Sequence, residues 1–476
     1  MSARRPASIS RPISRPLRMH GLSRALSLPL AMLGLLAMLA LLGPAEGAAQ
    51  QRFFAAPGDL PRIDGRVQAM VVDSACAAVD SVYVIGDEAA QIVARWRSQL
   101  AEGAYGELTD PADFVARLQA DAFSIRRDGH FGMRAMFPLD PAQSERAADP
   151  RDTECYARAQ RARNYGFQKI EMLPGGVGYL KLDVFAGTED ASETAVAAMN
   201  FLANSSALII DLRENSGGSA AMIRLLATYL FSEPAHLINW YKRATDETEQ
   251  SHTYDYVPGR RITDAPVFVL TSDRTGSAAE EFTFDLQNLE RATIVGDTTA
   301  GAGHTVAQAV FDFDGFRLGM RIPFGRAYDP RTGEGWEGRG VIPDVAVPAE
   351  QALAAAHSAA LGRLLEEESD PAGRQMLEWH VQTLASRLHP MTLTRAELEE
   401  YVGVYGPRRV FMEGDILCAQ RDGRALLRLL PMERDLFGNE GRDDFRLRFE
   451  RDGEGRIVRV VGLYEDGQTD PLARTE

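Results

Sequence analysis

Residues 207–219 have the sequence ALIIDLRENSGGS, and this stretch decides the class of fold. An apolar run ends at Asp211, and the pair Gly217-Gly218 leads into a helical pattern that starts near Ala220. The run is typical of a buried strand, and paired glycines let a backbone come close to a ligand. Such a strand–turn–helix unit places its turn at the carboxyl edge of an open α/β sheet, where ligands bind. A purely structural tight turn is the alternative.

Residues 265–282 repeat this design. The apolar stretch APVFVLTS (265–272) precedes the turn Thr275-Gly276-Ser277, and a helical pattern follows. Strand-like and helix-like segments alternate in this way through residues 175–300, which predicts a largely parallel sheet with crossover helices. If the two units are neighbours in that sheet, Ser277 lies beside the Gly217-Gly218 turn.

The patterns outside this region predict further segments. Residues 60–125 show helical spacing of apolar positions, the stretch around Asp314-Gly315 is typical of a hairpin, and short alternating runs follow residue 394. We therefore expect five parts: an export signal (1–49), a helical subdomain (50–135), an α/β core (136–350), a helical linker (351–392) and a small antiparallel β domain (393–476).

The first 49 residues are typical of an export signal. Arginines up to Arg24 precede an apolar stretch over residues 28–42, and small residues follow, so cleavage after Gly47 or Ala49 fits. An uncleaved membrane anchor is the alternative, but the apolar stretch is shorter than the roughly 20 residues of a spanning helix. We expect a periplasmic or secreted protein of a bacterium, with no membrane contact beyond this signal.

Composition limits the partners and cofactors. The net charge is −15, and an acidic chain is poorly suited to neutralise nucleic-acid phosphates. The three cysteines are Cys76, Cys155 and Cys418; Cys76 and Cys155 could pair in an oxidising compartment, although spacing alone does not decide it. Because no Cys/His pattern has metal-site spacing, we expect neither a metal nor another cofactor.

Ser277 permits two interpretations. With Glu280 three residues later, it forms a capping box, in which the hydroxyl only satisfies backbone N–H groups. A serine at the mouth of a strand-to-helix turn is also a place for a nucleophile, because the helix N-terminus favours developing negative charge. A nucleophile needs a base, and no lysine follows Lys242. His130 and His304 each lie in a glycine-containing turn suited to a cleft, and the residues alone leave both open.

Four motifs carry a resemblance to a known family. They are ALIIDLRENSGGS (207–219), VLTSDRTGSAAEEF (269–282), IVGDTTAGAG (294–303) and WEGRGVIPDV (336–345). In this order and at these separations they resemble the serine peptidase family that includes the C-terminal processing peptidases, the tricorn core and the interphotoreceptor retinoid-binding protein modules. The resemblance implies an α/β fold with a ClpP/crotonase-like core.

The resemblance also implies roles for residues. Ser277 matches the nucleophile, and Gly217 or Gly218 together with Ala278 matches the oxyanion donors. The processing peptidases carry a lysine base in a G-K-G turn, where this chain has Ala302, so a Ser–Lys mechanism is excluded.

The tricorn-like branch of the family supplies a different base. Its catalytic histidine matches His130, and a glutamate before the last motif matches Glu337. That branch has a serine directly before the histidine, where this chain has Gly129, so Glu337 would contact His130 directly or through water. About fifty residues separate His130 from the strand GYLKLD, which is too few for a PDZ module.

Three functions are compatible with these residues. The first is a serine endopeptidase that acts on peptides or unfolded proteins, with Ser277 forming the acyl-enzyme and His130 as general base. The alternatives are a non-catalytic module that binds hydrophobic ligands on the same fold, and a hydrolase of small esters or amides. Glu280 is assigned to capping or turn support. The sequence specifies neither the oligomeric state nor the cleavage preference.

Overall fold

The computed structural model describes residues 62–137 and 150–476. The expected export signal therefore lies outside the described residues. In the part that is described, no helix is both long enough and apolar enough to cross a membrane.

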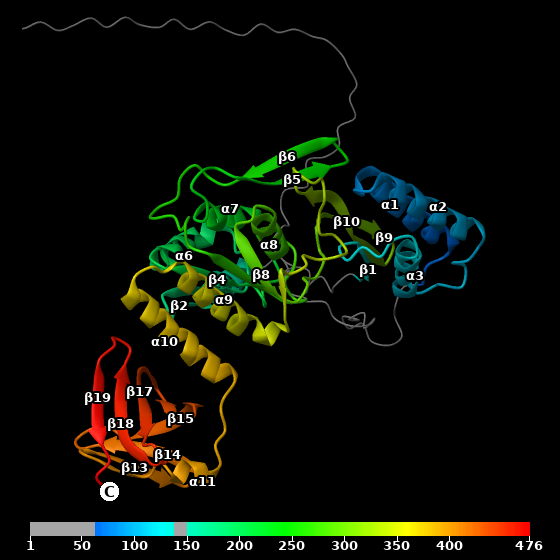
Figure 1. The fold of residues 1–476 in the computed structure, drawn as a ribbon. Coiled ribbons are helices and arrows are strands. Elements are labelled where there is room, and N and C mark those ends of the chain that lie inside the picture. Colours follow the sequence, from blue (N-terminus) through cyan, green and yellow to red (C-terminus); the bar gives the residue numbers. More distant parts are fainter. Residues whose placement is uncertain (1–61, 138–149) are drawn as a thin grey trace, which may run out of the picture. The chain divides into compact units, whose positions relative to one another are not determined.

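A six-stranded sheet forms the centre of the fold, with the strand order β11-β8-β7-β4-β3-β2 (Figure 1). Its strands are β2 (Phe167–Leu173), β3 (Val177–Leu182), β4 (Ala207–Asp211), β7 (Val267–Thr271), β8 (Ala292–Gly296) and β11 (Val345–Ala346). All neighbours in this sheet are parallel except β2 and β3. The predicted parallel sheet is thereby confirmed, and β4 and β7 are direct neighbours.

Helices cover both faces of this sheet. One face packs against α6 (Thr188–Phe201), α7 (Ala220–Thr228) and α8 (Ala278–Asn288), in an apolar core that includes Leu180, Ile210 and Phe282. The other face packs against α9 (Ala352–Glu367) through Ala356 and Ala360. Since both faces are covered, the central strands β4 and β7 are buried along their whole length, as is typical of parallel sheets.

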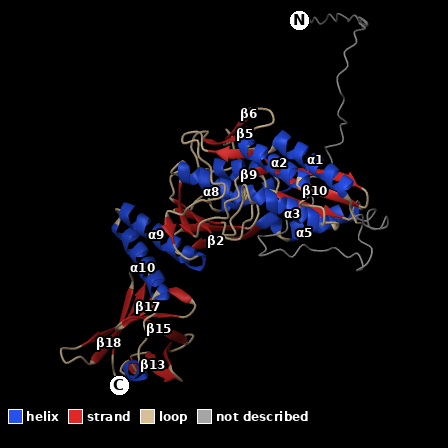
Figure 2. Cartoon of the chain, turned by 90° about the vertical axis from the view of Figure 1, so that its right-hand side faces the viewer, coloured by secondary structure: helices blue, strands red, loops and turns tan. Residues whose placement is uncertain are grey.

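The N-terminal helices pack on a second sheet. These helices are α1 (Gly65–Val82), α2 (Gly86–Ala101) and α3 (Pro111–Phe123). They share one apolar core with strands β1 (Gly132–Met136), β9 (His304–Phe313) and β10 (Phe316–Tyr328), beside which they lie in Figures 1 and 2. The predicted hairpin is the β9–β10 pair. The three N-terminal helices and this hairpin thus share one core, although residues 124–303 separate them in the sequence.

The same sheet continues through β5 (His236–Lys242) to β6 (Glu247–His252). Helix α5 (Pro150–Ala162) precedes β2. The sequence analysis predicted none of these three elements.

The C-terminal part of the chain, from residue 371, holds helices α10 (Pro371–Leu388) and α11 (Arg395–Glu399) and an eight-stranded sheet. The sheet is an antiparallel meander in which each strand pairs with the next in sequence. Its strands are β12 (Gly403–Tyr405), β13 (Arg408–Glu413), β14 (Ile416–Arg421), β15 (Leu427–Glu433), β16 (Leu436–Asn439), β17 (Arg442–Arg451), β18 (Ile457–Tyr464) and β19 (Thr469–Ala473). Backbone hydrogen bonds of Val404 with Thr475 and Glu476 return the chain end to the first strand.

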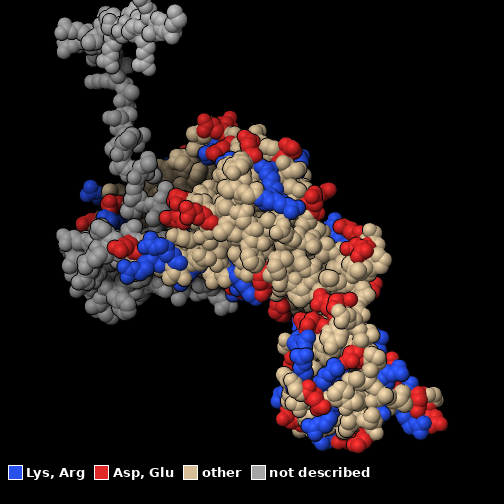
Figure 3. Space-filling model, turned by 90° about the vertical axis from the view of Figure 1, so that its left-hand side faces the viewer, with Lys and Arg blue, Asp and Glu red and all other residues tan. Residues whose placement is uncertain are grey.

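Two further observations concern side chains. Cys76, Cys155 and Cys418 are all free thiols; Cys155 is exposed, whereas the other two are buried. On the face drawn in Figure 3, acidic and basic side chains are interspersed, and neither sign forms a continuous field there.

Candidate active site

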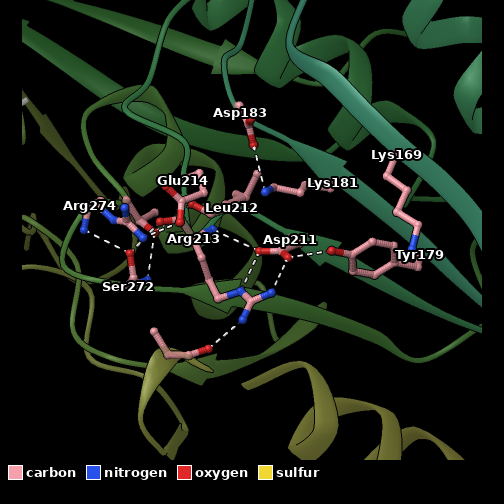
Figure 4. Close-up of polar contacts among 12 residues, drawn as sticks. Lys169, Tyr179, Lys181, Asp183, Asp211, Leu212, Arg213, Glu214, Ser272 and Arg274 are labelled. Atoms are coloured by element: carbon pink, nitrogen blue, oxygen red, sulfur yellow. Dashed lines mark hydrogen bonds and ion pairs between the residues drawn. The ribbon is translucent and has the colours of Figure 1, made fainter. Parts of the chain in front are cut away.

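The loops that follow β4 and β7 are fastened to one another. Ser272 Oγ donates to the carbonyl of Arg213 at 2.6 Å, and Thr275 Oγ1 donates to the carbonyl of Leu212 at 2.8 Å. Gly276 N–H donates to the carbonyl of Asn215 at 3.0 Å. Figure 4 shows the first part of this network, including the ion pair between Arg274 and Glu214. These bonds bring the two turns together, as the sequence predicts.

Asp211 anchors the end of β4. It is 1% exposed and accepts hydrogen bonds from the Arg213 guanidinium and from Tyr179 Oη at 2.7 Å. Burial alone would raise the pKa of Asp211, but the bonds from Arg213 and Tyr179 hold it below its usual value. Arg213 also donates to the carbonyl of Ala349 at 2.7 Å (Figure 4), so the strand end is fixed from both sides.

The two glycines of the first turn have no substitutes. Gly217 has φ +115° and Gly218 has φ +139°, a region that favours glycine. A Cβ on Gly217 would lie 2.8 Å from Ser277 Cβ, and one on Gly218 would lie 2.1 Å from the Phe185 carbonyl oxygen. The Gly217 turn therefore directly adjoins Ser277.

Two amide groups at this junction are free to bind a ligand. Gly217 N–H donates to Asn215 Oδ1 at 2.9 Å and is therefore occupied. Within residues 62–137 and 150–476, Gly218 N–H and Ala278 N–H donate to no protein acceptor. Of the two predicted glycines, Gly218 is thus the one with an available donor. Unpaired N–H groups beside a serine are the kind of donor that an oxyanion needs.

Ser277 has an unusual backbone. It is the N-cap of α8 with φ +53° and ψ −119°, whereas most N-cap residues are extended. Ser277 and Glu280 are placed as a capping box, and the Ser277 N–H donates to Glu280 Oε2 at 2.8 Å. The Glu280 N–H bonds to the Ser277 carbonyl at 2.9 Å. Positive φ at a serine is costly, and such strain gathers at functional sites, which favours the nucleophile interpretation.

Glu280 organises the turns around Ser277. Its side chain is fully buried and accepts four hydrogen bonds, from Ser277 N–H, Thr299 Oγ1, Gly301 N–H and Ala302 N–H, at 2.6 to 2.8 Å. Burial raises the pKa of Glu280, although each of these bonds favours the carboxylate. The predicted role in turn support agrees with these contacts.

His130 and Glu337 are adjacent. His130 Nδ1 lies 3.5 Å from Glu337 Oε2, and both side chains are largely buried. The same oxygen accepts from Gly303 N–H at 2.6 Å. His130 Nδ1 itself is buried and makes no hydrogen bond with any described residue. The carboxylate is thus held firmly by the 301–303 turn, while its contact with the imidazole is long.

The turn over residues 301–303 connects the two halves of the site. Glu280 binds the N–H groups of Gly301 and Ala302 on the Ser277 side, and Glu337 binds that of Gly303 on the His130 side. Among the described contacts, no hydrogen bond joins the Ser277 hydroxyl to His130. Catalytic hydrogen bonds are often long in the absence of substrate and shorten when it binds.

Two residues of the site, Asp128 and Tyr83, escaped sequence analysis, and both meet His304, which the sequence left open as a possible base, at the Asp128 carboxylate. Asp128 Oδ2 accepts from His304 Nδ1 at 3.0 Å and from Tyr83 Oη at 3.3 Å, and Asp128 Oδ1 accepts from His130 N–H at 2.8 Å. The spacing of Asp128 and His130 is that of an Asx turn, which was the only local signal. His304 Nδ1 also lies 3.7 Å from Glu337 Oε2.

The same group has the donor atoms of a cation site. Asp128, His130 and Glu337 each offer one oxygen or nitrogen within 4.8 Å of the others. Among the described residues, this is the one group of three such side chains whose donor atoms lie close enough together to share a metal ion. Their positions in the sequence, 128, 130 and 337, have no metal-site spacing.

Helix α8 also buries two carboxyl groups below the site. Glu281 is 3% exposed and Asp285 is 1% exposed, and Glu281 Oε1 and both Asp285 oxygens make no hydrogen bond with any described residue. Burial raises the pKa of Glu281 to about 8, and burial together with Glu281 raises that of Asp285. Both groups are therefore kept protonated in the folded chain at pH values where an unfolded chain releases the protons.

Replacing Glu281 by glutamine should make stability depend less on pH. In the wild type the folded state retains a proton between roughly pH 4.5 and pH 8 that the unfolded state has lost, so stability falls as pH rises through this window. The slope is at most about 1.4 kcal/mol per pH unit for this group. Urea unfolding at several pH values gives the free energy of unfolding as a function of pH. This dependence should be shallower for Glu281→Gln than for the wild type, and unchanged for the exposed control Glu290→Gln. Equal slopes for all three proteins would contradict the prediction.

Comparison with known proteins identifies the central segment. Residues 176–347 match the model of peptidase family S41. A carboxyl-terminal-processing protease of Picosynechococcus sp. is 31% identical over 195 residues, which are 40% of this chain and 44% of that protein. The chloroplastic carboxyl-terminal-processing peptidase 1 of Arabidopsis thaliana is 28% identical over 189 residues, which are 39% of this chain and 36% of that protein.

The chain spans less than half the length of these curated relatives. Among solved structures, the photosystem II D1 C-terminal processing protease has 16% identity and a TM-score of 0.39, with coverage of 60% of this chain and 94% of that one. The resemblance predicted from the four motifs is confirmed over the matched segment, which contains Gly218, Ser277 and Glu337 but not His130.

Proposed function

We propose that this chain is a serine endopeptidase with a ClpP/crotonase-like core, and that Ser277 is its nucleophile. The observation that carries this proposal is the turn of Ser277, whose positive φ holds it beside two unpaired N–H groups. A helix cap needs neither feature, because an extended serine satisfies helical amides without strain. The match of the surrounding segment to an S41 peptidase model supports the same conclusion.

In the proposed reaction His130 accepts the proton of Ser277 Oγ as that oxygen bonds to the peptide carbonyl carbon. The carbonyl oxygen becomes an oxyanion between the N–H groups of Gly218 and Ala278. The C–N bond then breaks, and His130 returns the proton to the leaving amine. Water, deprotonated by His130, attacks the acyl-enzyme in the same manner and releases the second product with free Ser277.

Glu337 is proposed to orient His130. Its carboxylate is fixed by Gly303 N–H, so the imidazole has one fixed acceptor 3.5 Å from Nδ1. Gly129 provides no hydroxyl to relay this contact. A bridging water would fit the long separation and would hold the proton on Nδ1, which leaves Nε2 free to act as the base.

The proposed substrate is a peptide or an unfolded protein outside the cytoplasm. The export signal predicted over residues 1–49 carries the proposal of a periplasmic or secreted location. The matched relatives bear the name of carboxyl-terminal-processing proteases, which supports peptide as the substrate class.

Labelling of the serine tests the proposal. The chain from residue 50 and its Ser277→Ala variant would be treated with a fluorophosphonate and, separately, with a mixed peptide library, and both reactions read by mass spectrometry. We expect adduct formation at Ser277 and peptide cleavage, both lost in the variant. Labelling without cleavage would favour a hydrolase of small esters or amides. A folded wild type that neither labels nor cleaves would favour the ligand-binding module.

A further inference from the structure

Asp128 is the point where distant parts of the chain meet. It is 1% exposed and lies in the loop between α3 and β1, which also carries His130. Tyr83, directly after α1, and His304, the first residue of β9, both bond to its Oδ2 atom. One buried carboxylate thus ties the His130 loop to the strand that follows the 301–303 turn.

The contacts of His130 show why this tie matters. The imidazole makes no hydrogen bond through Nδ1 to a described residue, and its distance to Glu337 is 3.5 Å. The backbone, in contrast, is fixed by a 2.8 Å bond to Asp128 Oδ1. Asp128 therefore fixes the backbone that carries the ring.

We propose that His304 and Asp128 form a positioning pair that holds the His130 loop against the 301–303 turn. This inference rests on the proposed function. His304 acts here as a hydrogen-bond donor, through the proton on Nδ1, because an ionised carboxylate only accepts. It neither touches the substrate nor takes the Ser277 proton.

Charge burial makes this pair necessary. Asp128 is almost fully buried, and the shortest hydrogen bond to its Oδ2 atom is the 3.0 Å bond from His304 Nδ1. A buried carboxylate that loses its main donor is destabilised and moves toward water. Because the His130 N–H is bonded to the same carboxylate, the loop would move with it. A displacement of about 1 Å at a catalytic group is enough to lower the rate on the order of 10²-fold.

Two substitutions of His304 distinguish a hydrogen-bond donor from a general base. In His304→Asn the side-chain amide keeps an N–H near the place of Nδ1, whereas His304→Ala removes it. A positioning residue should tolerate the first change and not the second. A histidine that acts as a base would lose its function in both.

Asp121 provides a matched control. It is a carboxylate of the same helical segment, 4% exposed, and accepts from Tyr105 Oη at 2.9 Å and from Arg117 Nε at 3.2 Å. It has no contact with His130 or His304 among the described bonds. Asp121→Asn therefore reports what the loss of a buried carboxylate does to the helical segment alone.

The experiment measures kcat and KM on a peptide cleaved by the wild type, together with hydrogen exchange over residues 126–131. We expect His304→Ala and Asp128→Asn to lower kcat about 10- to 100-fold with KM within about threefold, and to speed exchange in this loop. His304→Asn should retain at least about a third of kcat and wild-type exchange. Asp121→Asn should leave both kcat and exchange over residues 126–131 unchanged.

Several outcomes would overturn the inference. One is wild-type kcat in His304→Ala, and another is equal loss in His304→Asn and His304→Ala. An equal fall of kcat in Asp121→Asn would show a general loss of structure instead. If the wild type neither cleaves nor labels at Ser277, the proposed function fails; the pair is then judged by hydrogen exchange alone, and unchanged exchange in His304→Ala would reject it.

Discussion

Ser277→Ala and His130→Ala are each expected to lower kcat for peptide cleavage by on the order of 10³-fold or more, and the double variant is expected to be no slower than either. The reason is that nucleophile and base act in one step, so the loss of one makes the other useless. Initial rates of peptide cleavage at saturating substrate measure this. Far-UV circular dichroism of each variant would show that the fold is retained.

The controls for this prediction are two other histidines. His236 and His252 stack on one another on β5 and β6, with ring centroids 4.4 Å apart. Replacing either by asparagine should leave kcat unchanged, since neither contacts a residue of the site among the described bonds. Near wild-type cleavage by His130→Ala would reject His130 as the base, and additive losses in the double variant would show that the two residues act separately.

Gly217→Ala should lower kcat by on the order of 10²- to 10³-fold, the range seen when an oxyanion donor is lost. The added methyl would lie 2.8 Å from Ser277 Cβ, 2.9 Å from the Gly276 carbonyl oxygen and 3.0 Å from Ala278 N. Two of these atoms are backbone and cannot rotate away, so Ser277 and the Ala278 N–H must both shift. Steady-state kinetics on the same peptide, with fluorophosphonate labelling rates, would measure the effect.

Gly333→Ala separates this clash from backbone strain. Gly333 has φ +73°, yet no atom lies within 4 Å of a Cβ added there. The variant should therefore lose stability from its positive φ but keep kcat. If Gly217→Ala retained wild-type kcat, the turn would not support an oxyanion, and the nucleophile interpretation of Ser277 would lose its main geometric support.

The central sheet and the Ser277 turn could be predicted because their signals are local. Apolar runs mark β4 and β7, glycines mark the turns, and parallel strands bring both turns to one edge. The same reasoning could not decide whether Gly217 or Gly218 supplies the oxyanion donor. Only the geometry shows that Asn215 binds the Gly217 amide, whereas the Gly218 amide has no acceptor among the described residues.

The Asp128 network could not be predicted because its signals are distributed. Asp128 and His304 are 176 positions apart and meet only because the N-terminal helices pack on the β9–β10 hairpin. Tyr83 bonds to the same carboxylate from the end of α1. Periodicity predicts each of these elements but not which of them share a core. Polar contacts across such a core depend on packing, which a single sequence does not contain.

The C-terminal sheet has a feature that bears on aggregation with unfolded polypeptides. Because Val404 pairs with Thr475 and Glu476, the first strand of that sheet has a hydrogen-bonded partner on both sides. An open sheet edge is a template on which other extended polypeptides add and aggregate. A peptidase that handles unfolded protein would meet such polypeptides constantly. The bonds at Val404 leave fewer free backbone groups on the β12 edge for them to pair with, so this edge is a poorer template for the substrates proposed for this chain.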